Sequence, residues 1–215
     1  MKRLILLLLV FVSLVGGAQS VVQRLSSNTT GRDSVPVPQH MKFMGIPIDG
    51  TLTSFTKELK KKGLKHIETF DREQIKFFVG NFAGYTDCLV YAIAASPEGS
   101  RVVGVVVTFA PDEKWSRLAS QYETLKRRLT SKYGKPATCV ERFQTYVQPN
   151  DDFMRMQYLK SDKCEYKCVF ETEEGMIALE ISHKDWDFGD FNNVSLTYID
   201  RANGVAMDQD AIDDL

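Results

Sequence analysis

Five apolar residues between Pro111 and Pro136 recur at alternating intervals of three and four, the spacing that places side chains on one face of an α-helix. They are Trp115, Leu118, Tyr122, Leu125 and Leu129. Gly134 and Pro136 are typical of a helix end, and Lys132 favours the last turn through the helix dipole. We predict a helix that begins near Pro111. Its wide apolar face requires a second layer of structure to cover it.

Segments of alternating apolar and polar residues lie on both sides of this helix and predict antiparallel strands. Those before it are 66–70, 75–82, 88–94 and 101–109, and those after it are 138–147, 154–160, 165–172, 176–182 and 194–200. Turn residues at 96–100 and 173–175 each join two strands into a hairpin. Residues 102–107 are apolar on both faces, which is typical of a strand inside a sheet.

A shorter helix precedes these strands. Thr51 is its expected N-cap, and Phe55 and Leu59 lie on its apolar face. Gly63 stands where a left-handed residue ends a helix, which would bring Leu59 against Leu64.

The order of helix followed by antiparallel strands therefore occurs twice. We predict an α+β fold with two helix-plus-antiparallel-sheet halves, residues 41–110 and 111–200. A tandem repeat is one interpretation of this order. A single mixed α+β domain is the alternative.

Residues 1–18 have the three parts of a secretory signal peptide. A basic start at Met1-Lys2-Arg3 precedes an apolar run over 4–15, and small residues at 16–18 offer a cleavage site before Gln19. The apolar run is too short to span a bilayer, so we expect no stable membrane insertion. These features predict a periplasmic or secreted protein.

Two further segments are polar. Residues 19–40 are typical of a flexible tether, and residues 201–215 form a polar and acidic tail. Within the tether, Asp33-Ser34-Val35 is similar to an acceptor for O-glycosylation in exported bacterial proteins. A plain polar linker is the alternative interpretation of Ser34.

Export permits disulfides, and the chain has four cysteines. Cys164 and Cys168 lie about 13 Å apart on one predicted strand and cannot bond each other. We predict a disulfide between Cys139 and either Cys164 or Cys168, and a buried thiol at Cys88. The spacing lacks the second close ligand pair of a zinc site, so no metal is expected.

Several segments resemble an uncharacterised family of secreted bacterial proteins. They are Phe43 to Thr51, the Lys60-Lys61-Lys62-Gly63-Leu64 end of the first helix, Gly80 to Tyr85 with Cys88, and the helix from Trp115 to Pro136. The resemblance covers most of 42–200. The family has no assigned activity, so it implies no catalytic residues. The order of elements is also similar to the β-lactamase-inhibitor-protein-like fold, in topology only.

Residues suited to catalysis are few. The histidines are His40 in the tether, His66 at a strand start, and His183 beside Asp185. Gly-x-Ser-x-Gly and His-Glu-x-x-His motifs are absent. An envelope hydrolase that uses the His183/Asp185 pair, or carboxylates such as Glu173 and Glu174, remains an alternative function.

The segment from Asp185 to Phe191 is the best candidate for binding. Its predicted binding residues are Asp185, Trp186, Asp187, Phe188, Asp190 and Phe191. Aromatic side chains among polar neighbours suit a binding hot spot, and Phe153 and Tyr158 are weaker candidates of the same kind. The three carboxylates do not follow the EF-hand order, so calcium is not expected.

These observations predict an exported, non-enzymatic binding or interaction module without a cofactor. Its partner is an unknown protein or envelope component. The chain has 27 Lys and Arg against 28 Asp and Glu, and this lack of basic excess excludes nucleic acid as the expected partner.

Overall fold

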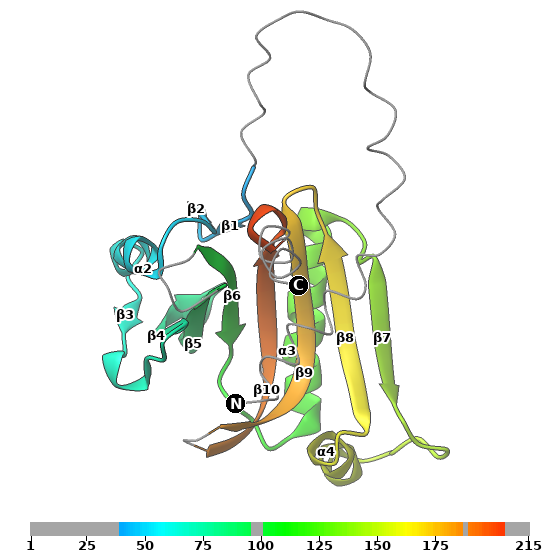
Figure 1. Ribbon diagram of the computed structural model, residues 1–215. Helices are drawn as coiled ribbons and strands as arrows, with labels where there is room; N and C mark the ends of the chain where they lie inside the picture. Colours follow the sequence, from blue (N-terminus) through cyan, green and yellow to red (C-terminus); the bar gives the residue numbers. More distant parts are fainter. Residues whose placement is uncertain (1–38, 96–100, 187–188, 205–215) are drawn as a thin grey trace, which may run out of the picture. The chain divides into compact units, whose positions relative to one another are not determined.

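The computed structural model describes residues 39–95, 101–186 and 189–204 of the chain (Figure 1). The predicted signal peptide, the tether up to residue 38 and the tail from residue 205 lie outside these residues. The elements of the first half are β1 (Lys42–Phe43), β2 (Ile46–Pro47), α2 (Leu52–Lys61), β3 (Lys65–His66), β4 (Ile75–Phe82), β5 (Tyr85–Ala94) and β6 (Val102–Thr108).

The second half begins with the long helix predicted from the sequence. Its elements are α3 (Trp115–Tyr133), β7 (Thr138–Phe143), α4 (Asp152–Lys160), β8 (Cys164–Glu171), β9 (Gly175–Trp186) and β10 (Gly189–Asp200). The two predicted hairpins are present as β5–β6 and β8–β9.

Eight strands form one antiparallel sheet in the order β3-β4-β5-β6-β10-β9-β8-β7 (Figure 1). The strands of the two halves meet where β6 pairs with β10, with Val105 opposite Tyr198 and Val107 opposite Leu196. Helices and one large antiparallel sheet make an α+β fold, as predicted. A repeat that relates the two halves stays a prediction.

Helix α2 begins and ends as its sequence predicts. The side chain of Thr51 accepts a hydrogen bond of 3.2 Å from the backbone N–H of Ser54, which caps the N-terminus. At the other end, the N–H of Leu64 donates to the carbonyl of Leu59 at 3.2 Å. Gly63 lies between them with a φ of 89°, a left-handed conformation that glycine adopts without strain.

Helix α3 buries all five residues of its predicted apolar face. It begins at Trp115 and not near Pro111. The side chain of Asp112 accepts a hydrogen bond of 2.8 Å from the N–H of Lys114, which holds the chain in a turn before the helix.

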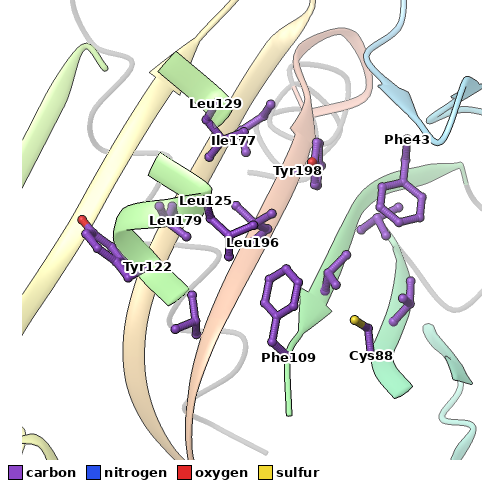
Figure 2. Packing of buried hydrophobic residues seen from close by; sticks show 14 of the residues in the cluster. Phe43, Cys88, Phe109, Tyr122, Leu125, Leu129, Ile177, Leu179, Leu196 and Tyr198 are labelled. Atoms are coloured by element: carbon purple, nitrogen blue, oxygen red, sulfur yellow. The ribbon is translucent and has the colours of Figure 1, made fainter. Parts of the chain in front are cut away.

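Helices α2, α3 and α4 and both halves of the sheet contribute to one apolar core, part of which Figure 2 shows. Phe43 of β1 stacks on Phe82 with ring centroids 5.2 Å apart and meets the edge of Tyr198 at 5.4 Å. Phe109 packs edge-on against Tyr85 at 5.0 Å. These aromatic contacts join the short N-terminal strands to the sheet.

The prediction of a strand over 154–160 is wrong, because these residues lie in helix α4. The side chain of Asp151 accepts a hydrogen bond of 2.7 Å from the N–H of Met154 and caps the helix. Only Met156 and Leu159 of α4 are buried. Two buried residues do not make a helical period that can be recognised in the sequence.

Two strands are shorter than predicted. The strand over 138–147 ends at Phe143, where the side chain of Gln148 binds the N–H of Phe143 at 3.4 Å and its carbonyl at 3.0 Å. The strand over 66–70 is reduced to β3, and Glu68–Phe70 forms a 3₁₀ turn.

The first and last segments of the described chain are tied together at Asp200, which is fully buried. Its carboxylate accepts hydrogen bonds from the N–H of Met41 at 2.7 Å and the N–H of Asn203 at 2.9 Å, and His40 Nδ1 lies 3.1 Å away. The side chain of Asn203 donates to the carbonyl of Ile48 at 3.0 Å. His40 and Asn203, which the sequence assigns to the tether and the tail, are therefore both part of this network of contacts.

Replacing Asp200 by alanine should lower the free energy of unfolding by about 2–5 kcal/mol, because two buried backbone N–H groups would lose their acceptors. Chemical denaturation measures this change. Glu173→Ala removes an exposed carboxylate from the β8–β9 turn and should change stability by less than about 0.5 kcal/mol. A loss for Asp200→Ala no larger than that of this control would contradict the structural role of Asp200.

Candidate functional site

The predicted binding segment lies at the tip of the hairpin formed by β9 and β10. Trp186 pairs with Gly189, Asp185 with Asp190, and Lys184 with Phe191. The strands therefore continue well beyond the predicted limits of 182 and 194. Asp187 and Phe188 lie outside the described residues, and so do the side chains of Asp185, Trp186 and Asp190; that of Phe191 is half-buried. The binding role of these residues stays a prediction.

A chain of polar contacts begins at His183, below this tip. His183 Nδ1 lies 2.9 Å from the side-chain oxygen of Asn192, which is buried. The Asn192 amide donates to Glu113 at 3.0 Å, and Glu113 accepts a hydrogen bond of 3.0 Å from Lys160. These contacts connect the hairpin with the segment before α3 and with the last residue of α4.

The residues predicted to serve a hydrolase do not all lie close to one another. His183 and Asp185 lie two positions apart on β9. Glu173 and Glu174 lie in the β8–β9 turn, at the opposite end of β9. The length of strand between Glu174 and His183 corresponds to about 30 Å. The carboxylate pair and the histidine therefore cannot act on one bond.

The exposed large apolar side chains of the described residues are concentrated between β7 and the first turn of α4. They are Tyr146, Val147, Phe153 and Met154, which we call the α4 surface. Tyr146 is fully exposed, and Val147 and Phe153 are 72 % and 70 % exposed. These four side chains lie within nine positions of the chain, and exposed apolar side chains that form one patch are typical of an interaction surface.

Of the two weaker predicted binding residues, Phe153 and Tyr158, only Phe153 is exposed. Tyr158 is half-buried and packs against Phe143 with ring centroids 6.2 Å apart. Tyr158 belongs to the edge of the core, and only Phe153 is available to a partner.

The backbone beneath the α4 surface is held firmly. Asp152 accepts hydrogen bonds from the hydroxyl of Ser116 at 2.6 Å and from its N–H at 3.2 Å. These bonds to Ser116 hold the pKa of Asp152 below its usual value. Arg155 donates to the carbonyl of Pro149 at 3.1 Å, which ties the loop to the helix. The apolar side chains are thus presented from an ordered segment.

The α4 surface and the hairpin tip lie at the same end of the sheet (Figure 1). The contacts of Glu113 with Asn192 of β10 and Lys160 of α4 place both elements beside the start of α3.

A disulfide joins Cys139 of β7 to Cys168 of β8, which lie directly opposite each other. The predicted pairing is confirmed, with Cys168 and not Cys164 as the partner. Cys164 is half-buried, and burial raises the pKa of its thiol to about 12. Cys88 is a buried thiol, as predicted.

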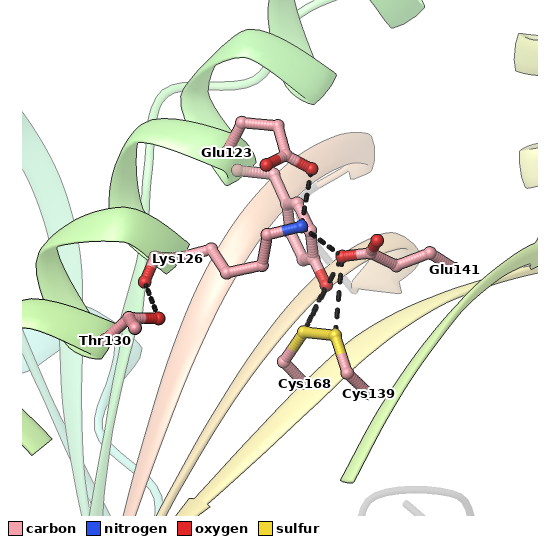
Figure 3. The surroundings of a disulfide bond; sticks show 7 residues. Glu123, Lys126, Thr130, Cys139, Glu141 and Cys168 are labelled. Atoms are coloured by element: carbon pink, nitrogen blue, oxygen red, sulfur yellow. Dashed lines mark hydrogen bonds and ion pairs between the residues drawn. A yellow bond between two sulfur atoms is a disulfide. The ribbon is translucent and has the colours of Figure 1, made fainter. Parts of the chain in front are cut away.

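Charged side chains surround this disulfide (Figure 3). A carboxylate oxygen of Glu141 lies 3.4 Å from the sulfur of Cys139 and 3.6 Å from that of Cys168. Lys126 binds Glu141 at 2.6 Å and Glu123 at 2.7 Å. Burial alone lowers the pKa of Lys126, but its bonds to the two carboxylates hold it above the usual value.

The remaining contact of the disulfide is with Tyr122 of α3. The phenol oxygen lies 3.0 Å from the sulfur of Cys168. Burial and the charge of Glu141 raise the pKa of Tyr122 far above its usual value, so the phenol stays protonated. Cys139, Glu141 and Cys168 have the spacing of metal ligands, but bonded sulfurs are not thiolates and do not act as such.

Comparisons of the chain with protein-family models, with curated proteins and with solved structures find no match. The resemblance to a secreted bacterial family and to the β-lactamase-inhibitor-protein-like fold therefore stays a prediction. No helix in the described part of the chain is both long enough and apolar enough to cross a membrane.

Sequence reasoning missed most of the α4 surface, because Tyr146 and Val147 were assigned to a strand. The signal that could have found it is the run from Gln148 to Asp152. Proline, asparagine and two aspartates in succession favour a turn followed by a helix N-cap. The apolar residues just before and just after such a turn do not belong to a strand or a long helix, so they have no buried face of such an element on which to lie.

We expect two free thiols in the exported, oxidised protein when it is denatured without reductant, and four after reduction. A disulfide that closes a sequence separation of 29 residues stabilises a fold by about 3–4 kcal/mol, so Cys139→Ser should lose about that amount. The reduced wild-type protein should match the variant in chemical denaturation. Four free thiols without reductant would exclude the disulfide.

Proposed function

We propose that this protein is an exported, non-enzymatic binding module, and that the α4 surface is the centre of its recognition site. The exposure of Tyr146 and Phe153 is the observation that carries the proposal. Exposed aromatic side chains in water bring no stability to the fold, whereas they dominate the energy of many protein interfaces. The partner is a protein or envelope component with a complementary apolar surface.

The arrangement of the site supports this proposal. The cap at Asp151 and the bonds between Asp152 and Ser116 order the backbone before any partner arrives. An ordered backbone lowers the entropy that binding must overcome. The hairpin tip at the same end of the sheet supplies a second contact region, in which the predicted binding residues Trp186 and Phe188 lie.

The proposed location outside the cytoplasm rests on two features. Residues 1–18 have the composition of a signal peptide, and the chain contains a disulfide that oxidising compartments preserve. A periplasmic or secreted protein would meet its partner in the cell envelope.

The double change Tyr146→Ser and Phe153→Ser should weaken binding to the purified partner at least about tenfold, because two aromatic anchors are lost. The partner is first captured from envelope extract with the wild-type protein, and its dissociation constant is then measured for each variant. Stability should change by less than about 0.5 kcal/mol, since both side chains are exposed.

Lys57→Ser with Lys60→Ser, on the exposed face of α2, is the matched control and should bind like the wild type. Trp186→Ala with Phe188→Ala tests the hairpin separately. Unchanged affinity of the Tyr146/Phe153 variant would reject the α4 surface as the recognition site. If only the hairpin variant loses the partner, the site lies at the hairpin tip.

A further inference from the structure

We propose that the disulfide between Cys139 and Cys168 is a site of thiol–disulfide exchange with an external dithiol reductant. The thiolate of the reductant attacks the sulfur of Cys139, and the sulfur of Cys168 leaves as a thiolate. The second thiol of the reductant then breaks the mixed disulfide and releases Cys139. Two electrons pass from the dithiol to the protein, and the reductant leaves as a disulfide.

The two sulfurs of the disulfide differ in their exposure to solvent, and this difference determines which sulfur the thiolate attacks. Cys139 is exposed on the edge strand β7, and it lines a surface pocket of about 520 Å³ beside α3. Cys168 is completely buried beneath Tyr122. An attacking thiolate must approach the sulfur to which it bonds, so only Cys139 can accept it in the folded protein.

The charges around the bond allow an anion to approach. Glu141 lies 3.4 Å from the sulfur of Cys139 and by itself would repel a thiolate. Lys126 binds Glu141 at 2.6 Å and Glu123 at 2.7 Å, and Lys126 together with Arg127, which also lines the pocket, balances the charges of the two carboxylates. Without Lys126, two carboxylates, Glu123 and Glu141, would face the incoming thiolate.

The leaving sulfur has a hydrogen-bond donor already in place. A disulfide sulfur carries no hydrogen, so in the 3.0 Å contact between Tyr122 and Cys168 only the phenol can donate, and Glu141 competes with the sulfur for its single hydrogen. When the bond breaks, the same hydrogen bond stabilises the new Cys168 thiolate. Bonds from a donor to a charged acceptor are stronger than those to a neutral one, so Tyr122 favours the displaced state.

The direction of attack is tested with glutathione, a monothiol that has no second thiol in the same molecule to break the mixed disulfide, so that an acid quench can trap it. The folded, oxidised protein is treated with glutathione, quenched with acid, denatured, alkylated and mapped by mass spectrometry. We expect glutathione on Cys139 and the alkyl group on Cys168. Glutathione mainly on Cys168, or a reaction that occurs only as fast as the protein unfolds, would overturn the proposal.

The roles of the neighbours are tested by the rate of reduction with dithiothreitol. Tyr122→Phe keeps the volume of the ring and removes the donor, and it should slow reduction about tenfold. Lys126→Ala should slow reduction about threefold, whereas Lys126→Arg should retain the wild-type rate. Lys132→Ala, an exposed lysine on the same helix, is the control and should change nothing.

The pKa of the Cys168 thiol distinguishes loss of the hydrogen-bond donor from a general structural effect of Tyr122→Phe. In the reduced, folded protein its pKa should rise in the variant, while the slow labelling of the buried Cys88 should stay as in the wild type. A tenfold slower reduction together with these two results supports the donor role. An unchanged rate in both Tyr122→Phe and Lys126→Ala would overturn the proposed exchange mechanism.

Discussion

The pairing of β6 with β10 is the interaction on which the rest of the structure depends. It is the only place in the described sheet where strands from the two halves exchange hydrogen bonds. Gly104 allows the close approach, because a Cβ atom there would lie 2.8 Å from the carbonyl oxygen of Tyr198. Val105 and Val107 then pack beside Tyr198 and Leu196, so that one core serves both α2 and α3. Without this pairing each half would have an uncovered edge and half of a core.

Much of the fold could be predicted because its signals are local. The caps of α2, the apolar face of α3 and the β8–β9 hairpin each depend on residues a few positions apart. The β6–β10 pairing joins residues about ninety positions apart, and no local pattern specifies it. The choice of Cys168 over Cys164 has the same origin, because it follows from the register that sets Cys139 opposite Cys168.

The α4 surface was harder to predict, because it consists of apolar side chains that remain exposed after the chain folds. Tyr146 and Val147 have high strand propensity, and the sequence does not reveal that β7 ends at Phe143. Beyond Phe143 the chain turns, with the N–H of Thr145 donating to the carbonyl of Phe143 at 2.9 Å, and the side chain of Gln148 binds across this turn. Helix α4 is short, and its two buried residues do not mark a face. Exposed and buried apolar residues become distinguishable only when the chain is folded.

The disulfide and the α4 surface are connected through β7. This strand lies at the edge of the sheet, pairs only with β8 and buries only Phe143, and the disulfide adds a covalent bond to its hydrogen-bonded pairing with β8. Tyr146 and Val147 follow directly after it, whereas Phe153 and Met154 stand on α4, which Asp151 caps independently. Tyr146 and Val147 are thus positioned through β7 and its pairing with β8, whereas Phe153 and Met154 are positioned by the cap of α4.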